Sequence, residues 1–464
     1  MVRVRLAPSP TGMMHIGTAR AGLFVWLFAR QHEGKFILRI EDTDKERSTK
    51  EYEDSIVNGL RELGLGWDEF YRQSERTDIY KEYLTRLVSE GKVYPCFCSK
   101  EELDAERVAA ESEKRSVIYS GKCSDIPPEE AAKRIGDGEA FTLRFRMPKE
   151  KISFDDMVRG HVEYDGTLIG DIVIAKNYDE PLYNFVVVID DALMQITHVI
   201  RGEDHLSNTP KQIAIFKAIG YEAPSFGHLP LILNADRSKM SKRGGDTALV
   251  EFLEKGYMPE AIINFLALLS WHPKDDREIF SKEDLIKEFS IERVQKGGSI
   301  FDYAKLNWLN RYYINHVIPT SEILARAARF IPSDWKPTTM MIDSVKSRLD
   351  TLSEIKEALA IFFEPLSYEA EMLHFKDKLL STKPNLMKIL SVIESADDSD
   401  FVNSESVEFI LRNVVDPDAK GEYLWPLRVA LSGRKASPGP YEIMSALGKK
   451  DSVSRITEAI EKLS

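Results

Sequence analysis

The chain has 464 residues, of which 43% are hydrophobic and 30% are charged, and its formal net charge is −12 at pH 7. This length suits two to four globular domains, whereas three cysteines are too few for a disulfide scaffold and no apolar run is long enough for a membrane span. The acidic charge does not point to a nucleic-acid partner and does not exclude one. Because the first residues already have a strand pattern and no signal-peptide character, we expect a cytoplasmic protein.

The first 95 residues predict alternating strands and helices. Strands are expected at 2–6 and 35–40, and helices at 18–31, 48–63 and 77–90. This order is typical of a parallel sheet that binds a nucleotide where a strand leads into a helix.

Residues 96–180 interrupt this alternation. They contain the cysteines, a charged helical run at 100–115 and short strands around 141–147, 161–164 and 171–175. The mixture predicts an α+β insertion within the nucleotide-binding fold.

The α/β pattern then returns, with strands predicted at 185–189 and 197–200 and a helix from about residue 210. Beyond about residue 310 the strand signal fades. Apolar residues from 341 to 362 recur at steps of three and four, which predicts an amphipathic helix, and the Ser- and Asp-rich stretch 394–406 predicts a loop. The C-terminal half is therefore expected to be helical.

Two short segments carry most of the functional information. His15-Ile16-Gly17-Thr18 follows a turn-rich stretch after the first strand, a place where backbone amides at a helix N-terminus can bind phosphate. Lys239-Met240-Ser241-Lys242-Arg243 places two lysines three residues apart around a serine. Mobile cations of this kind suit the charge that spreads over phosphate oxygens during phosphoryl chemistry.

Together these residues resemble a known family. Pro8-Ser9-Pro10-Thr11-Gly12 leading into His15-Ile16-Gly17 resembles the HIGH signature of class I aminoacyl-tRNA synthetases in its glutamate-specific form, and Lys239–Arg243 resembles the KMSKS loop. The blocks at 39–44, 71–76 and 197–205 agree. The resemblance to bacterial glutamyl-tRNA synthetases covers almost the whole chain.

The resemblance implies an α/β fold, namely a Rossmann-type class I catalytic domain interrupted by an α+β acceptor-end insertion and followed by an all-α anticodon-binding half. The expected boundaries are 1–95 for the first part of the catalytic domain, 96–180 for the inserted lobe, 181–310 for the second part with the KMSKS and stem-contact region, and 311–464 for the anticodon-binding domain.

The activity that the resemblance implies is that of a glutamate–tRNA ligase. Such an enzyme activates L-glutamate with ATP and Mg²⁺ to glutamyl-adenylate and transfers it to the terminal adenosine of tRNA-Glu. We expect it to act as a monomer. Three alternatives are an enzyme that also charges tRNA-Gln, a truncated paralogue that glutamylates tRNA-Asp but lacks the helical half, and a silent RNA-binding paralogue, which would usually have lost the HIG or lysine signature.

The resemblance also assigns site residues. The expected catalytic residues are His15, Lys239 and Lys242. The expected ATP-binding residues are Pro8, Gly12, His15, Gly17, Thr18, Asp204, Lys239, Ser241, Lys242 and Arg243. The expected glutamate-binding residues are Arg5, Ala7, Ser9, Glu41, Tyr183 and Arg201. A substrate with two carboxylates and one ammonium needs cations and an anion in fixed geometry, and the sequence leaves open which arginine takes which carboxylate.

The cysteines predict a structural zinc site. Cys96, Cys98 and Cys123 would supply thiolates, with Asp125 or alternatively Tyr119 as the fourth ligand, as in part of the family. The alternative is three buried thiols that only pack.

Arg348 is the residue expected to contact the anticodon. It lies within the predicted 341–362 helix, where Leu349 and Leu352 take the buried stripe and leave Arg348 on the flank. In relatives that discriminate between tRNAs, an arginine at this motif position resembles a reader of the third anticodon base. A surface arginine paired with a nearby acid is the alternative.

Overall fold

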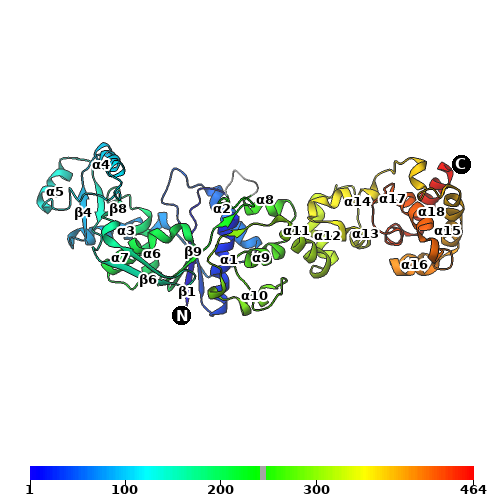
Figure 1. Ribbon diagram of the computed structural model, residues 1–464, viewed down its shortest axis with the longest axis horizontal. Helices are drawn as coiled ribbons and strands as arrows, with labels where there is room; N and C mark the ends of the chain where they lie inside the picture. Colours follow the sequence, from blue (N-terminus) through cyan, green and yellow to red (C-terminus); the bar gives the residue numbers. More distant parts are fainter. Residues whose placement is uncertain (241–246, 464) are drawn as a thin grey trace. The chain divides into compact units, whose positions relative to one another are not determined.

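The computed structural model describes residues 1–240 and 247–463. The chain forms two compact units. Unit 1 consists of Met1–Phe252 and Ile262–Asp302, and unit 2 consists of Leu253–Ala261 and Tyr303–Ser464. Figure 1 shows that unit 1 combines strands with helices and that unit 2 is helical.

Unit 1 is organised around a seven-stranded sheet with the order β3-β2-β1-β9-β10-β6-β7. Its neighbouring strands are parallel except in the β6–β7 hairpin. The strands are β1 (Arg3–Leu6), β2 (Lys35–Ile40), β3 (Glu69–Arg72), β6 (Lys151–Asp156), β7 (Gly160–Asp165), β9 (His198–Gly202) and β10 (Ser225–Leu229). Because β2, β1 and β9 are parallel neighbours, their carboxyl ends meet at one edge, where open α/β sheets bind their ligands.

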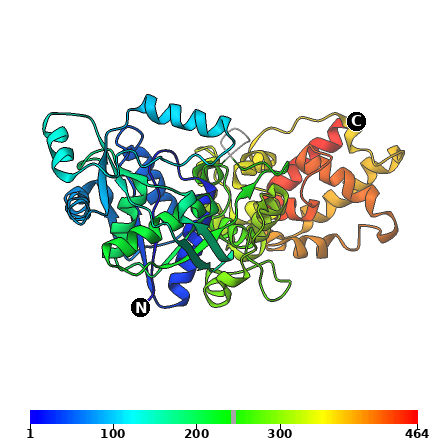
Figure 2. The same cartoon turned by 60° about the vertical axis from the view of Figure 1, so that its left-hand side comes forward.

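The inserted segment, together with the three residues that precede it, forms a second, antiparallel sheet with the order β4-β5-β8. Its strands are β4 (Val93–Cys96), β5 (Thr142–Phe145) and β8 (Ile172–Ala175). Helix α4 (Lys100–Ser112) lies at the periphery, seen as the cyan helix along the upper edge in Figure 2, and only Ala110 of its residues is buried. The predicted α+β character of this segment is confirmed, although the β6–β7 hairpin that it also supplies belongs to the main sheet.

The remaining helices of unit 1 pack around these sheets, with a short parallel pair of strands beside them. They are α1 (Ile16–Gln31), α2 (Lys50–Glu62), α3 (Thr77–Ser89), α5 (Pro128–Gly136), α6 (Tyr183–Leu193), α7 (Thr209–Ile219) and α10 (Lys282–Glu288), with the pair β11 (Ile232–Leu233) and β12 (Ser299–Ile300). Helices α8 (Leu249–Glu254) and α9 (Pro259–Leu268) contain residues of both units.

Strand β1 shows how alternation in the sequence serves the two faces of the sheet. Val4 and Leu6 are buried, and Leu6 lies against α1, where a Cβ added to Gly22 would come within 3.1 Å of Leu6 Cδ2. Arg5 alternates with them and therefore points to the opposite face. There it meets Asp191 of α6, which places a buried cation close to the carboxyl edge of the sheet.

The predicted strand at 185–189 is wrong, because these residues form the middle of α6. Phe185 to Ile189 are an unbroken apolar run with three consecutive valines, which favours a strand locally. In the folded protein every residue of this run is buried in one cluster with α3, α7 and the small sheet. Periodicity cannot distinguish such a fully buried helix from a buried strand, so tertiary packing decides.

Two adjacent carboxylates at the end of α6 tie the two parts of the nucleotide-binding fold together. Asp191 accepts hydrogen bonds from Arg5 of β1 at 3.1 Å and from Arg39 of β2 at 2.7 Å. Asp190 accepts hydrogen bonds from three groups within residues 73–80. These are Gln73 Nε2 at 3.0 Å, Arg76 Nε at 2.7 Å and the Tyr80 hydroxyl at 2.8 Å. Both carboxylates are buried, so the strands and helices before the insertion are held to the helix that follows it.

Unit 2 is helical throughout its described residues, as predicted for the C-terminal half. Its core is one cluster that extends from Met258 to Ala459. The helices are α11 (Tyr303–Tyr312), α12 (Thr320–Ala327), α13 (Thr339–Val345), α14 (Ile355–Phe363), α15 (Leu379–Ser395), α16 (Ser404–Leu411), α17 (Lys420–Ser432) and α18 (Pro440–Lys462).

The predicted single helix at 341–362 is wrong in one respect, because it is broken into α13 and α14. Leu349 and Leu352 are buried as expected, so the apolar spacing continues across the break. Between α13 and α14 the backbone makes hydrogen bonds with other segments instead of helical ones. The carbonyl of Asp350 accepts from Asn310 Nδ2 at 2.6 Å, and the amide of Leu352 donates to Gly256 O at 3.2 Å. The predicted loop at 394–406 is shorter than expected, since α15 continues to Ser395 and α16 begins at Ser404.

Replacing Asp190 tests how much its buried hydrogen bonds to Gln73, Arg76 and Tyr80 stabilise the fold. Asp190→Ala should lower the free energy of unfolding by about 3–5 kcal/mol, because it leaves the Arg76 guanidinium and two polar groups without their acceptor. Urea denaturation of the variant and the wild-type protein would measure this change in the free energy of unfolding. The control is Asp179→Ala, which removes an exposed pair with Lys81 and should leave the urea midpoint unchanged. Equal midpoints for both variants would contradict the role given to Asp190.

Candidate active site

The carboxyl edge of the main sheet borders a cleft of about 1220 Å³. Twelve of the residues expected at the site line it: Arg5, Ala7, Pro8, Ser9, His15, Gly17, Thr18, Glu41, Tyr183, Arg201, Asp204 and Lys239. Of the expected ATP and glutamate residues that the structure describes, Gly12 is the one that does not line it. Ser241, Lys242 and Arg243 lie outside the described residues.

His15 caps the helix that begins at the cleft. It is the N-cap of α1, and its Nδ1 accepts from the amide of Gly17 at 3.0 Å. A side chain at Gly17 would crowd this contact, because its Cβ would lie 3.2 Å from His15 Nδ1. With Nδ1 acting as acceptor, the neutral ring carries its proton on Nε2, which makes Nε2 a hydrogen-bond donor.

The His15 loop is joined by backbone hydrogen bonds to the segment that follows the second motif. Ile16 N donates to Thr247 O and Leu249 N donates to Met14 O, both at 2.8 Å. At the start of the second motif, Lys239 Nζ lies 3.3 Å from Asp204 Oδ2. Burial raises the pKa of Asp204, but the charge of Lys239 opposes this effect and the net pKa is lowered, so Asp204 is ionised.

Arg5, Arg39, Glu41 and Asp191 form a buried charged group at the ends of β1 and β2. Arg5 is paired with Asp191 through Nε and Nη2, and Arg39 bridges Asp191 and Glu41. Burial raises the pKa of Glu41 to about 7, against the opposing effect of Arg39 and Arg5. An added positive group in the cleft would therefore stabilise the ionised form of Glu41.

Arg201 has a different environment from Arg5. Its Nη1 donates to the Tyr183 hydroxyl at 3.4 Å, its Nη2 donates to Thr209 Oγ1 at 2.8 Å, and its Nε contacts His228 Nε2 at 3.2 Å. Among the hydrogen bonds and ion pairs of the described residues, none joins Arg201 to a carboxylate. Burial therefore lowers the pKa of Arg201, and its charge is available to an anion in the cleft.

Sequence reasoning missed two residues of this region. Asp191 was hidden because its helix was predicted as a strand, and only the fold brings it to Arg5. His205 belongs to a motif block that the sequence did reveal, and its Nδ1 lies 3.1 Å from the Tyr183 hydroxyl. Burial lowers the pKa of His205 to about 4, with the charge of Arg201 as a further cause, so the ring is neutral at pH 7.

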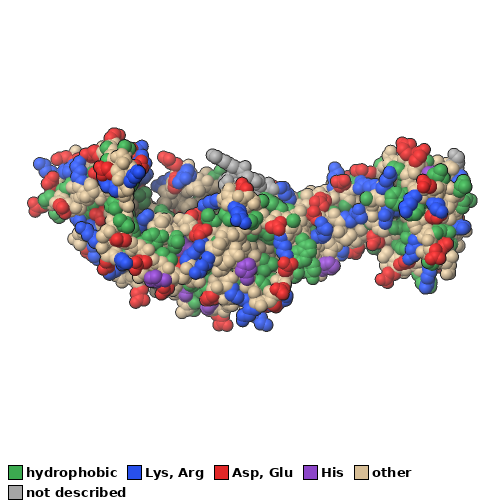
Figure 3. All heavy atoms as spheres, viewed as in Figure 1, with side chains coloured by type: hydrophobic (Ala, Val, Ile, Leu, Met, Phe, Trp, Pro, Cys, Tyr) green, Lys and Arg blue, Asp and Glu red, His purple; other side chains and the backbone are tan. Residues whose placement is uncertain are grey.

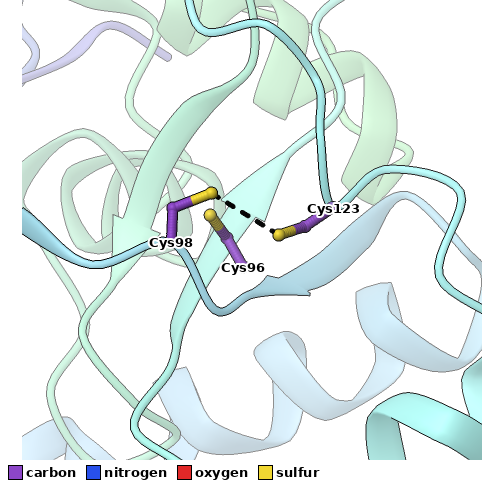
Figure 4. Close-up of side chains that lie close together, drawn as sticks. All are labelled: Cys96, Cys98 and Cys123. Carbon is purple, nitrogen blue, oxygen red and sulfur yellow. Dashed lines mark hydrogen bonds between the residues drawn. The ribbon is translucent and has the colours of Figure 1, made fainter. Parts of the chain in front are cut away.

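The three cysteines meet in the inserted lobe. Their sulfur atoms lie within 4.8 Å of one another, and Figure 4 shows them directed toward a common point. The Tyr119 hydroxyl lies 3.3 Å from Cys96 Sγ and 3.5 Å from Cys98 Sγ, and it accepts from the amide of Cys123 at 3.0 Å. Asp125 is not part of this cluster. Three thiols match the sulfur donors that bind zinc, and the phenol oxygen is the nearby atom that could complete a four-coordinate site.

Arg348 lies in unit 2, in a 3₁₀ turn (Lys346–Arg348) rather than on the flank of a continuous helix. Its side chain is exposed, and Nη1 donates to the carbonyl of Ser437 at 3.0 Å. One edge of the guanidinium is thus held by the protein. The expected alternative, a pair with a nearby acid, does not occur among the ion pairs of the described residues.

The surface carries both basic and acidic side chains, as the high content of charged residues predicts. On the face shown in Figure 3, basic and acidic side chains of the described residues are interspersed over both units. Within residues 1–240 and 247–463, no helix combines the length and hydropathy needed to cross a bilayer.

The structure has a split parallel sheet with a histidine-capped helix at its carboxyl edge and a buried pocket of arginines and carboxylates beside it. An inserted lobe interrupts the sheet, and a helical unit follows it in the chain. Together these features define a class I aminoacyl-tRNA synthetase. Comparison with known proteins agrees with this class. Residues 1–308 match the catalytic domain of class I tRNA synthetases for E and Q, and residues 305–460 match an anticodon binding domain.

Full-length relatives have the same organisation. The chain is 43% identical to a glutamate–tRNA ligase of Aquifex aeolicus over 475 residues, which cover 100% of the chain and 99% of that protein. It is 42% identical to a glutamate–tRNA ligase of a Sulfurihydrogenibium species, with 97% of each covered. A crystal structure of a glutamate tRNA ligase from Elizabethkingia meningosepticum, in complex with its amino acid, superposes with a TM-score of 0.88 at 32% identity over 100% of both chains. The chain belongs to the glutamate and glutamine family of class I tRNA synthetases.

Proposed function

We propose that this protein is a glutamate–tRNA ligase. The observation that carries the proposal is the pocket itself, a cleft that is lined by Arg5, Arg201 and Glu41. Glutamate presents two carboxylates and one ammonium, and the buried charged groups that line this pocket include the guanidinium groups of Arg5 and Arg201 and the carboxylate of Glu41. The names of the full-length relatives support the same substrate.

We assign the ammonium of glutamate to Glu41 and Ser9, and the carboxylates to Arg201, Arg5 and Tyr183. Arg5 is already neutralised by Asp191, whereas Arg201 has no carboxylate partner among the described residues. Arg201 therefore gains more from a substrate carboxylate than Arg5 does. Ala7 contributes the backbone of the loop that borders this part of the cleft.

We assign the ATP phosphates to the His15 loop and to the lysine motif. His15 contributes its Nε2 proton, and Pro8, Gly12, Gly17 and Thr18 allow close approach of the nucleotide to the start of α1. Lys239, Ser241, Lys242 and Arg243 contribute positive charge and hydrogen-bond donors as pyrophosphate departs, and Asp204 holds Lys239 until then. Bound Mg²⁺ would neutralise phosphate charge.

The reaction needs no side-chain nucleophile. The glutamate α-carboxylate attacks the ATP α-phosphorus, and the bond to pyrophosphate breaks. A hydroxyl of the terminal adenosine of tRNA then attacks the activated carboxyl carbon and loses its proton, and the bond to the phosphate breaks with release of AMP. The protein acts by positioning and by electrostatic stabilisation. We assign the acceptor end of the tRNA to residues 96–180 and the anticodon to residues 311–464, in a monomeric enzyme of the cytoplasm.

A preference for tRNA-Glu over tRNA-Gln follows if Arg348 reads an anticodon base with the edge of its guanidinium that Ser437 does not hold. An enzyme that charges both tRNAs is the alternative. The paralogue that modifies tRNA-Asp is disfavoured, because this chain has the helical unit that such a protein lacks.

We propose Zn²⁺ as the ion of the cysteine cluster, held by Cys96, Cys98, Cys123 and Tyr119. The phenol oxygen is adjacent to all three cysteines, whereas Asp125 lies outside the group, so Tyr119 is the better fourth ligand. The ion would be structural and would hold the lobe together.

Aminoacylation tests the function and the choice of tRNA together. With ATP and labelled glutamate, the protein should charge tRNA-Glu and should discriminate against tRNA-Gln. Arg348→Gln should narrow that difference by about 1–3 kcal/mol, the range of one lost base contact. Arg412→Gln, also exposed in unit 2, is the control and should leave the ratio unchanged. No charging of either tRNA would contradict the function, and an unaltered ratio in Arg348→Gln would contradict the assignment of Arg348 alone.

The pKa of Glu41 predicts a pH dependence of glutamate binding. Only the ionised carboxylate attracts the substrate ammonium, and a pKa of about 7 means that it is protonated as the pH falls below 7. The KM for glutamate should therefore rise about tenfold from pH 8 to pH 6, while the KM for ATP changes much less. Glu41→Gln should abolish this dependence. A glutamate KM that is constant over this range would disprove the role of Glu41.

Elemental analysis and chelation test the zinc site. The purified protein should contain about one zinc per chain. Tyr119→Phe should speed loss of the metal to a chelator by at least about tenfold, because it removes a ligand oxygen. Asp125→Asn should lose metal at the wild-type rate. If Asp125→Asn is the variant that loses zinc, the fourth ligand is wrong, and a folded protein without zinc would leave the cysteines as packing residues.

A further inference from the structure

Arg201 is oriented by neutral groups that surround its guanidinium. Nε donates to His228 Nε2 at 3.2 Å, and Nη2 donates to Thr209 Oγ1 at 2.8 Å and to the carbonyl of His205 at 3.4 Å. Nη1 is the end next to the Tyr183 hydroxyl, and both Arg201 and Tyr183 line the cleft. The geometry thus directs one end of the guanidinium toward the cleft and holds the other three N–H groups from behind.

His228 and Asp156 continue this arrangement across the sheet. His228 on β10 is in register with Arg201 on β9, and Asp156 ends the neighbouring strand β6. Asp156 Oδ2 lies 2.6 Å from His228 Nδ1, and both side chains are completely buried. Neither Asp156 nor His228 is among the residues that line the cleft.

Asp156 is fixed on its other oxygen as well. Its Oδ1 accepts from the backbone amides of Val158 at 2.9 Å, Arg159 at 2.8 Å and His228 at 3.2 Å. Burial raises the pKa of Asp156, but the hydrogen bonds from His228 and from these amides oppose burial and the net pKa is lowered. Asp156 is therefore an ionised carboxylate that can only accept hydrogen bonds.

The state of Asp156 determines the tautomer of His228. A carboxylate that only accepts requires a proton on His228 Nδ1, and this leaves a lone pair on Nε2. That lone pair accepts the Nε proton of Arg201 at 3.2 Å. The Thr209 hydroxyl also lies 3.1 Å from Nε2, and it can donate its own proton to the carbonyl of His205 instead. If the proton were on Nε2 instead, it could bond to Thr209, but the Arg201 Nε–H would lose its acceptor and the Nδ1 lone pair would face the Asp156 carboxylate, which is unfavourable in a buried site.

We propose that Asp156 and His228 are positioning residues for substrate binding, Asp156 by fixing the tautomer of His228 and His228 by orienting Arg201 toward the carboxylate of the amino-acid substrate. This inference depends on the function proposed above. A neutral imidazole orients the guanidinium without cancelling its charge, in contrast to Arg5, which is paired directly with Asp191. Arg201 thereby keeps both its direction and its full charge for the substrate.

Two substitutions of His228 separate orientation from packing. His228→Gln can place its amide oxygen close to the position of Nε2, so it can still accept from Arg201. His228→Asn can place its amide nitrogen close to the position of Nδ1, so it keeps the hydrogen bond to Asp156 and loses the acceptor for Arg201. In aminoacylation assays His228→Asn should raise the KM for glutamate by about tenfold or more and leave the KM for ATP within about twofold. His228→Gln should stay within about threefold of the wild type for both.

Asp156→Asn tests the tautomer in the same assay. The asparagine oxygen would take the backbone amides, and its NH₂ group would face Nδ1, which must then accept and shift the ring proton to Nε2. This variant should raise the KM for glutamate as His228→Asn does, and it should have little further effect in combination with His228→Asn. The control is Asp155→Asn, the exposed neighbour that contacts His161, which should leave both KM values unchanged.

Imidazole ¹⁵N NMR of the wild-type protein provides a readout that does not depend on how the variants fold. His228 should have a protonated Nδ1 and an unprotonated Nε2, and a protonated Nε2 would overturn the proposal. Equal losses in His228→Gln and His228→Asn, or parallel increases in the KM for glutamate and for ATP, would overturn it as well. A wild-type protein that does not charge tRNA with glutamate would refute the proposed function, and the NMR result would still decide the tautomer.

Discussion

The structure depends on a pair of adjacent buried carboxylates, Asp190 and Asp191, at the end of one helix. They meet guanidinium groups from two strands and a helix that precede the insertion in the chain. Each buried charge would be unfavourable alone, and each is stable only because its partners lie on elements held in the correct places. The insertion can therefore separate the two parts of the nucleotide-binding fold in sequence without separating them in space.

The same charges prepare the substrate site. Asp191 neutralises Arg5, so that a second buried arginine, Arg201, can remain unpaired beside it without two uncompensated cations in one pocket. Glu41 is held beside Arg39, where burial raises its pKa to about 7 and leaves it ready for a positive group. A pocket of this kind has its charges arranged before the substrate arrives, which reduces the reorganisation required for binding and for reaction.

The acidic composition is compatible with an RNA substrate because affinity for RNA does not need a strongly basic protein. Basic and acidic side chains are interspersed on the face in Figure 3, so local cations remain available. Recognition can then come from the shape of the RNA and from contacts with unpaired bases. A planar guanidinium, for example, can donate hydrogen bonds to the edge of an unpaired base. Non-specific attraction between an acidic protein and other RNA would be weak, which favours selectivity.

The sequence by itself determined the fold class, the order of the nucleotide-binding elements, the two signature segments and twelve of the residues that line the cleft. These features follow from local patterns: alternation in the first strand, turn residues before His15, and spaced lysines near residue 240. The tertiary structure decided the features that depend on distant neighbours. The run Phe185–Ile189 is part of a helix, and the helix predicted at 341–362 is interrupted around Leu349. Beside the cysteines, Tyr119 lies in contact and Asp125 does not belong to the cluster. The tertiary structure also brought Asp191 to Arg5 and His228 to Arg201, because burial and hydrogen-bond partners are set by elements far apart in the chain and leave no periodic signal in it.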